Sequence, residues 1–221
     1  MQEYPKAVSQ RDFTENQNMN RYRLRVSFFE SAQVGPDDIL MVGDSITEHC
    51  EFAEMTGNLR VKNRGIGGDT VAGLLNRIGN VTAGAPAAIV INIGINDFKP
   101  ENNNPNELLL ADFESIVKHV RGTCPQTALV CSSILPVNAA DFDRGADNSE
   151  IREYNDGIKS LCERYGAVFI DMFNEFYDPA GDVLPRRYTT DGIHLGGEGY
   201  EKYVGILDRE LGRVGVDFVL R

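Results

Sequence analysis

The sequence predicts an α/β fold in which a five-stranded parallel sheet lies between two layers of helices. Short apolar runs alternate with helical patterns along the chain, which is typical of a parallel sheet covered on both faces. Residues 87–93 form one apolar run, as expected for a strand buried on both sides. Because the 221 residues contain no repeat, low-complexity tract or linker, we expect residues 1–221 to form a single domain.

Each expected element follows from its local pattern. Residues 1–17 are polar and are expected to form a surface tail, and Leu24, Phe28 and Phe29 at helical spacing predict a first helix over 18–33. The expected strands are 39–42, 59–63, 87–93, 128–134 and 167–171. The expected helices after the first are 45–55, 71–78, 109–120, 151–165 and 200–211, and residues 172–190 are expected to be irregular.

Charge and composition exclude several classes of partner. The net charge is −11, which argues against nucleic acid and anionic membrane surfaces. No apolar run is long enough to span a bilayer, and the chain as given shows no signal peptide. We therefore expect a cytoplasmic protein, or a periplasmic or secreted one if a signal peptide was removed before Gln2.

The cysteines lack C-x-x-C spacing, which disfavours a metal site, and their apolar neighbours predict small buried side chains. They are Cys50, Cys124, Cys131 and Cys162.

Ser45 occupies the position where the first strand gives way to a helix. Open α/β sheets bind ligands at this edge, and the free N–H groups of a helix N-terminus favour negative charge there. A serine hydroxyl at this position could attack an acyl group, with its own N–H stabilising the oxyanion. The alternative is that Ser45 only caps its helix, since serine is a favoured N-cap residue.

Two further strands end in segments that could supply oxyanion donors. Gly68 lies in the glycine-rich segment after the second strand, and Asn96 follows the third strand. Because the carboxyl ends of parallel strands share one edge, Ser45, Gly68 and Asn96 can converge. The glycine-rich segment alone could also cradle a phosphate in an anion-binding module, although it lacks the lysine of a P-loop.

His194 is the expected base for Ser45. Asp191 precedes it by three residues, so one carboxylate can orient Nδ1 and leave Nε2 for the serine. His49, four residues after Ser45 on the same helix face, could also reach the hydroxyl, with Glu48 or Glu51 as its nearest carboxylates. His119 lies in the middle of an expected helix and is expected at the surface or its boundary.

Four short blocks together resemble the SGNH (GDSL-type) hydrolase family. They are Gly43-Asp44-Ser45, Gly67-Gly68-Asp69, Gly94-x-Asn96-Asp97 and Asp191-x-x-His194, and they follow the family's order over residues 43–194. The resemblance implies a flavodoxin-like three-layer α/β/α fold and ester hydrolysis through an acyl-enzyme, without metal or organic cofactor. It implies Ser45 as nucleophile and first oxyanion donor, Gly68 and Asn96 as further donors, His194 as base and Asp191 as its orienting carboxylate.

The glycine-rich segment is most similar to the branch that contains platelet-activating-factor acetylhydrolase catalytic subunits and carbohydrate O-acetylesterases. This branch implies a small ester substrate with a short acyl group, such as an acetylated sugar. Arg64 and Arg187 are candidate contacts to an acidic sugar, with solvated or salt-bridged arginines as the alternative. A lysophospholipase or thioesterase, an acyl transferase and a non-catalytic carbohydrate-binding module remain as alternatives, and homo-oligomerisation is left open.

Overall fold

The predicted fold class is confirmed by a computed structural model that describes residues 17–99, 102, 104–142 and 146–220. Within these residues, five parallel strands form one sheet in the order β2-β1-β3-β4-β5. The strands are β1 (Ile39–Gly43), β2 (Val61–Gly65), β3 (Ala88–Asn92), β4 (Ala128–Ser132) and β5 (Val168–Ile170). This is the flavodoxin-like order, in which the chain switches direction across the sheet between β1 and β3, and ligands bind beyond that point.

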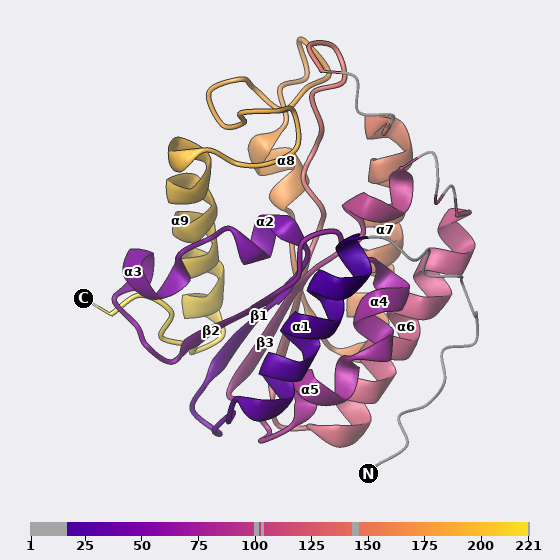
Figure 1. Cartoon of the computed structure of the whole chain (residues 1–221). Coiled ribbons are helices and arrows are strands. Elements are labelled where there is room, and N and C mark those ends of the chain that lie inside the picture. The colour runs from indigo at the N-terminus through magenta and orange to yellow at the C-terminus, as the bar shows by residue number, and fades with distance from the viewer. Residues whose placement is uncertain (1–16, 100–101, 103, 143–145, 221) are drawn as a thin grey trace.

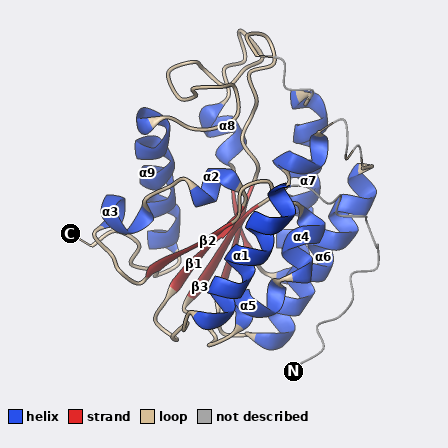
Figure 2. Cartoon of the chain, viewed as in Figure 1, coloured by secondary structure: helices blue, strands red, loops and turns tan. Residues whose placement is uncertain are grey.

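Helices cover both faces of the sheet (Figures 1 and 2). On one face α3 (Phe52–Thr56) packs against α9 (Gly197–Arg213). The other face carries α1 (Gln17–Ser31), α4 (Val71–Asn76), α5 (Ile78–Thr82), α6 (Asn106–Thr123) and α7 (Asn148–Tyr165). Three short helices follow the carboxyl ends of strands, namely α2 (Ser45–Glu48), the 3₁₀ helix η1 (Ile95–Phe98) and α8 (Met172–Phe176).

The core is built from the two central strands and the apolar faces of the helices. Every residue of β1 and β3 is buried, because each strand has neighbours on both sides and helices above and below. Helix α7 buries Ile151, Tyr154, Ile158 and Leu161, which recur at the three- and four-residue spacing of one helix face. Burying such a side chain stabilises the fold by about 2 kcal/mol.

The helix expected over 45–55 is interrupted between α2 and α3. The side-chain nitrogen of Asn63, on β2, donates hydrogen bonds to the carbonyl oxygens of Thr47 (2.8 Å), Glu48 (3.2 Å) and Cys50 (3.0 Å). These bonds satisfy carbonyl groups that the end of α2 leaves without helical partners. Helix α2 is therefore only one turn long, and its end is hydrogen-bonded to the neighbouring strand β2.

Other boundaries also differ from the expectation: the single helix expected over 71–78 is divided into α4 and α5, and several elements begin or end a few residues away from the predicted positions. Two of the differences have a clear local cause. Strand β2 begins two residues later than predicted, because the Asn58 side chain accepts from Arg60 N (3.0 Å) in a turn that leaves Leu59 at 78% exposure. Helix α8 lies at the start of the segment expected to be irregular, where Asp171 caps it by accepting from Asn174 N (3.0 Å).

All four cysteines are buried, as the sequence predicts, and all four are free thiols, which the sequence leaves open. No helix in the described part of the chain is long and apolar enough to cross a membrane. The expected surface tail lies, apart from Gln17, outside the described residues.

Candidate active site

Ser45 is the first residue of α2 and follows β1 with one residue between. That residue, Asp44, caps the helix by accepting from Ile46 N (2.9 Å). The chain turns closely here, since a Cβ on Gly43 would lie 2.2 Å from the carbonyl oxygen of Asn92 on β3. Ser45 is only 8% exposed, so its hydroxyl has a fixed place at the carboxyl edge of the sheet.

His194 and Asp191 reach this hydroxyl from the loop before α9. The Ser45 Oγ lies 2.8 Å from His194 Nε2, and His194 Nδ1 lies 2.8 Å from Asp191 Oδ2. The other oxygen of Asp191 accepts from the backbone nitrogens of His194 (2.9 Å) and Ile193 (3.1 Å). The hydroxyl of Thr189 donates to the carbonyl of His194 (2.8 Å) and so fixes the loop further.

The charge on Asp191 determines which ring nitrogen of His194 is protonated. Partial burial alone would raise the pKa of Asp191, but the hydrogen bonds from the His194 ring and from the His194 and Ile193 backbone hold it at about 2. An ionised carboxylate can only accept, so Nδ1 of a neutral His194 ring must donate and Nε2 must accept. The geometry therefore lets Nε2 accept the proton of Ser45.

His49 lies beside this group without replacing His194. It ends α2 as its C-cap and is exposed, and its ring centroid is 5.3 Å from that of His194 at an interplanar angle of 45°. Partial burial and the neighbouring His194 lower the pKa of His49. Among the described histidines, the one hydrogen-bonded to Ser45 is His194, while His119 contacts Thr82 (3.3 Å) on the helical layer.

The Gly68 loop and Asn96 are joined through Asp69, which directly follows Gly68. Asn96, on η1, donates from its side-chain nitrogen to the carbonyl of Asp69 (2.9 Å). This bond uses one of the two amide hydrogens of Asn96 and leaves the other for a ligand. Gly68 has a φ of +82°, a conformation in which glycine is favoured because it has no Cβ.

The two arginines predicted to contact a substrate, Arg64 and Arg187, differ in their exposure to solvent. Arg64 is 5% exposed and packs its guanidinium over the ring of Phe29 at 5.0 Å, so it is not available to a substrate, and that prediction is corrected. It turns toward α1 because strand residues alternate between the two faces of the sheet. Arg187 is exposed, stacks on Tyr188 at 4.6 Å and lines a surface hollow of about 520 Å³, where a role in substrate binding stays a prediction.

Sequence reasoning missed the contribution of Glu48. It entered only as a carboxylate near His49, but its side chain accepts from Gly67 N (2.6 Å) in the glycine-rich loop. Its position three residues after Ser45 gives no signal of this contact, which depends on how β2 lies against α2.

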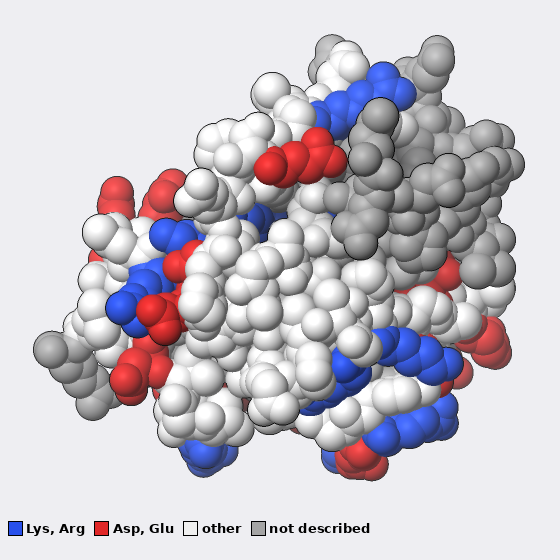
Figure 3. Space-filling model, turned by 90° about the horizontal axis from the view of Figure 1, so that it is seen from below, with Lys and Arg blue, Asp and Glu red and all other residues white. Residues whose placement is uncertain are grey.

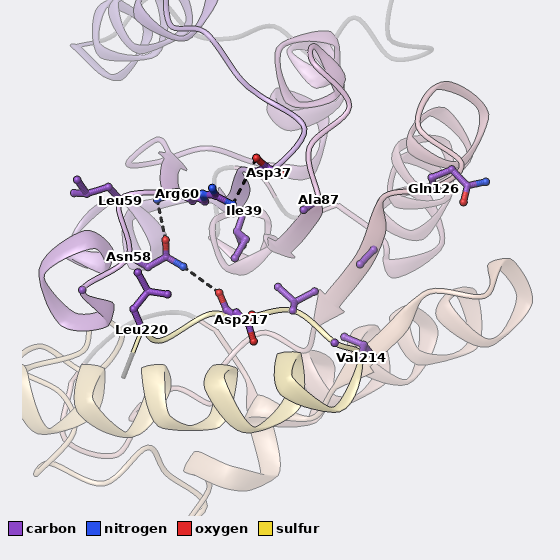
Figure 4. A pocket seen from close by; sticks show the side chains of 14 residues that line it. Asp37, Ile39, Asn58, Leu59, Arg60, Ala87, Gln126, Val214, Asp217 and Leu220 are labelled. Carbon is purple, nitrogen blue, oxygen red and sulfur yellow. Dashed lines mark hydrogen bonds and ion pairs between the residues drawn. The ribbon is translucent and has the colours of Figure 1, made fainter.

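A second hollow lies at the other end of the sheet and is a poor candidate for chemistry. Its volume is about 780 Å³ (Figure 4). It is lined by residues at the starts of β1, β3 and β4 and by residues of the segment 214–220. Its described lining contains Asp37, Asn58 and Arg60 but no Ser, Cys or His that could serve as nucleophile or base. Figure 3 shows the molecule from below, with charged side chains around a wide uncharged centre.

Comparisons with known proteins agree with this geometry. The model of the GDSL-like lipase/acylhydrolase family matches residues 41–202. The human platelet-activating factor acetylhydrolase IB subunit alpha2 is 27% identical over 176 residues, which cover 75% of this chain and 72% of that protein. A Streptococcus pneumonia structure described as a candidate platelet activating factor is 30% identical, with a TM-score of 0.77 over 90% of this chain and 95% of that one.

A mutant of an acetylxylan esterase from Geobacillus stearothermophilus shares the fold, at 21% identity and a TM-score of 0.67 over 86% of this chain and 99% of that one. The family match extends from β1 into α9 and includes every residue of the Ser45–His194–Asp191 group. The chain therefore belongs to the GDSL-like lipase/acylhydrolase family and is an ester hydrolase.

Proposed function

We propose that this chain hydrolyses short-chain, principally acetyl, esters of carbohydrates through an acyl-enzyme formed on Ser45. The observation that carries the proposal is the continuous hydrogen-bonded group Asp191–His194–Ser45, with both heavy-atom distances at 2.8 Å. These are the distances at which a serine can transfer its proton to an imidazole that a carboxylate orients.

In the proposed reaction, Ser45 Oγ attacks the ester carbonyl while His194 Nε2 takes its proton. The imidazolium then gives that proton to the oxygen of the leaving alcohol as the carbon–oxygen bond breaks. Water enters, loses a proton to His194, and attacks the acyl-enzyme. His194 then returns that proton to Ser45 Oγ as the bond between the acyl carbon and Oγ breaks, which releases the acid and restores Ser45. Asp191 stabilises the imidazolium in both halves.

The oxyanion formed in each half is assigned three donors. Ser45 N–H belongs to the first turn of α2, where backbone donors have no helical acceptor. The N–H of Gly68 and the second amide hydrogen of Asn96 complete the set. Losing one such donor in a serine hydrolase typically reduces kcat by about 10²–10³.

The acetyl preference is supported by relatives, since the names of the platelet-activating factor acetylhydrolase subunit and of the acetylxylan esterase both specify an acetyl group. The proposal that the ester belongs to a carbohydrate is based on the acetylxylan esterase, which is similar to this chain in fold. Platelet-activating factor is the second candidate substrate, because the relative at 27% identity is named for it.

A panel of p-nitrophenyl esters tests the acyl preference, followed by acetylated xylo-oligosaccharides and platelet-activating factor. We expect kcat/KM to fall from acetate to octanoate, and acetate release from the sugar to exceed that from platelet-activating factor. A preference for octanoate would contradict the proposal, because each CH₂ buried in an apolar pocket favours binding by about 0.8 kcal/mol.

Ser45→Ala tests the nucleophile. We expect loss of about 10⁴-fold or more in kcat with the thermal midpoint retained, and loss of labelling by a serine-reactive phosphonate. Turnover by the variant at the rate of the unmodified protein would exclude Ser45. If the unmodified protein binds glycans but is not labelled by the phosphonate and releases no acetate, it is a carbohydrate-binding module and not an esterase.

A further inference from the structure

The loop that carries Gly68 is packed directly against α2. A Cβ on Gly65 would lie 2.3 Å from the backbone nitrogen of Glu48, and one on Gly67 would lie 2.9 Å from its Oε2. The loop also donates from Ile66 N to the carbonyl of Gly43 on β1 (3.0 Å). Any shift of residues 65–68 therefore changes their position relative to Ser45.

Glu48 joins this loop to α1 through a single carboxylate. Its Oε2 accepts from Gly67 N (2.6 Å) and from Arg21 Nη2 (2.5 Å), and its Oε1 lies 3.3 Å from Arg25 Nε. Arg25 in turn donates from Nη2 to the carbonyl of Gly65 (3.2 Å). The Glu48 side chain is only 12% exposed, whereas those of Arg21 and Arg25 are 49% and 28% exposed, so the carboxylate is shielded from water while its arginine partners are partly solvated.

We propose that Glu48 is a positioning residue for the oxyanion site. Its carboxylate fixes Gly67, the residue directly before the Gly68 donor, while Arg21 and Arg25 fix the carboxylate. The inference rests on the proposed function, because it assigns Glu48 a role in aligning a donor of that reaction. Donors stabilise an oxyanion best when their place is set before charge develops.

This assignment also gives α1 a part in the site. The side chains of α1 bond to the elements that flank the loop: Arg25 donates to the carbonyl of Gly65 at the end of β2, and the Tyr22 hydroxyl donates to the carbonyl of Gly73 in α4 (2.7 Å). Arg21 reaches the loop indirectly, through Glu48 on α2. Helix α1 thus holds the two elements that flank the loop and the carboxylate that binds Gly67.

Two variants of Glu48 distinguish the loss of its hydrogen-bond acceptor from the loss of its negative charge. Glu48→Ala removes the acceptor of Gly67 N–H, and we expect kcat to fall by about 10- to 100-fold with KM within about twofold, because the lost alignment acts in the transition state. Glu48→Gln keeps an oxygen that can accept from Gly67 and should retain more of kcat than Glu48→Ala.

Glu210 provides a matched control. It pairs with Arg209 (2.8 Å) and Arg213 (2.6 Å) on α9, and its side chain is 17% exposed. Glu210→Ala removes a similar pair of ionic contacts and should leave kcat unchanged. With active sites counted by phosphonate titration, a Glu48→Ala kcat within about twofold of the unmodified protein would overturn the inference.

Amide hydrogen exchange of the peptide spanning residues 62–75 gives a readout that does not depend on turnover. We expect faster exchange at Gly67 and Gly68 in Glu48→Ala and no change in Glu210→Ala. Unchanged exchange in Glu48→Ala overturns the positioning role even if activity falls. If the unmodified protein hydrolyses no ester but exchange is still faster in Glu48→Ala, then Glu48 does position Gly67 and the proposed function is wrong instead.

Discussion

Replacing Asp44 by asparagine is expected to change how the stability of the protein depends on pH. Asp44 is completely buried beside Ser45, and its Oδ2 has no hydrogen-bond partner among the described residues. Burial raises its pKa from 3.8 to about 7, with a further contribution from the negative charge of Asp69, although the hydrogen bond from Ile46 N opposes the shift.

The sign follows from proton counting. Between about pH 4 and about pH 7 the folded protein keeps a proton on Asp44 that the unfolded chain releases, so stability falls as pH rises. A shift of about three pKa units, at about 1.4 kcal/mol each, makes this loss about 4 kcal/mol once pH exceeds about 7. Asparagine has no such proton, and its side-chain oxygen can still accept from Ile46 N.

Urea unfolding at steps of about one pH unit between about pH 4 and about pH 8 measures the effect. The unfolding free energy of Asp44→Asn minus that of the unmodified protein should rise by up to about 4 kcal/mol across this range. Comparing the two proteins at each pH cancels the other titrating groups. A difference that stays flat or falls with pH would refute the reasoning.

Asp147→Asn is the matched control, because Asp147 caps α7 by accepting from Ser149 N (2.6 Å) but is exposed. The hydroxyl and backbone N–H of Ser149 lower the pKa of Asp147. Its carboxylate therefore adds stability above its unfolded pKa that is lost as pH falls. The same free-energy difference for Asp147→Asn should fall as pH rises through the acid range, opposite to Asp44→Asn.

Three further substitutions test other parts of the structure. Asp191→Asn should lower kcat by about 10⁴, because it no longer favours the ring tautomer that serves Ser45; kcat within tenfold of the unmodified protein would contradict this. Arg77→Met should destabilise the fold by about 3–5 kcal/mol in urea unfolding, because it leaves Asp69, 2.8 Å away and equally buried, without its partner; a loss below about 1 kcal/mol would mean that Asp69 is protonated at no cost. Gly65→Ala should lower the free energy of unfolding by about 1–3 kcal/mol and lower kcat as well, because the new Cβ would lie 2.3 Å from the backbone of α2. Gly122→Ala is the control and should leave kcat unchanged, because a Cβ at this position on α6 meets open space.

The sheet and the meeting of the site loops could be predicted because both depend on local patterns combined with one rule of topology. Apolar runs mark strands, and the carboxyl ends of parallel strands share an edge, so Ser45, Gly68 and Asn96 could be placed on one rim before their contacts were known. The three-residue spacing of Asp191 and His194 likewise sets a local hydrogen bond.

Features that depend on the packing of distant elements could not be predicted. The break after α2 is stabilised by Asn63 from another strand, and the contacts of Glu48 depend on where α1 lies. Arg64 was expected near a substrate because it ends a strand, but the alternation of side chains places it against Phe29. Helix α8 is five residues long, too short for its periodicity to be recognised.

The burial of the four thiols makes them reporters of local opening. Burial raises the pKa of Cys50 to about 12, and the hydrogen bond with Cys162 together with burial holds the pKa of Cys131 well above its usual range, so these two thiols offer little thiolate to an alkylating reagent in the folded state. Maleimide modification should then proceed only as fast as segments open. Cys50, between α2 and α3, would report excursions next to the nucleophile, while Cys131, on β4, would report disruption of the central sheet.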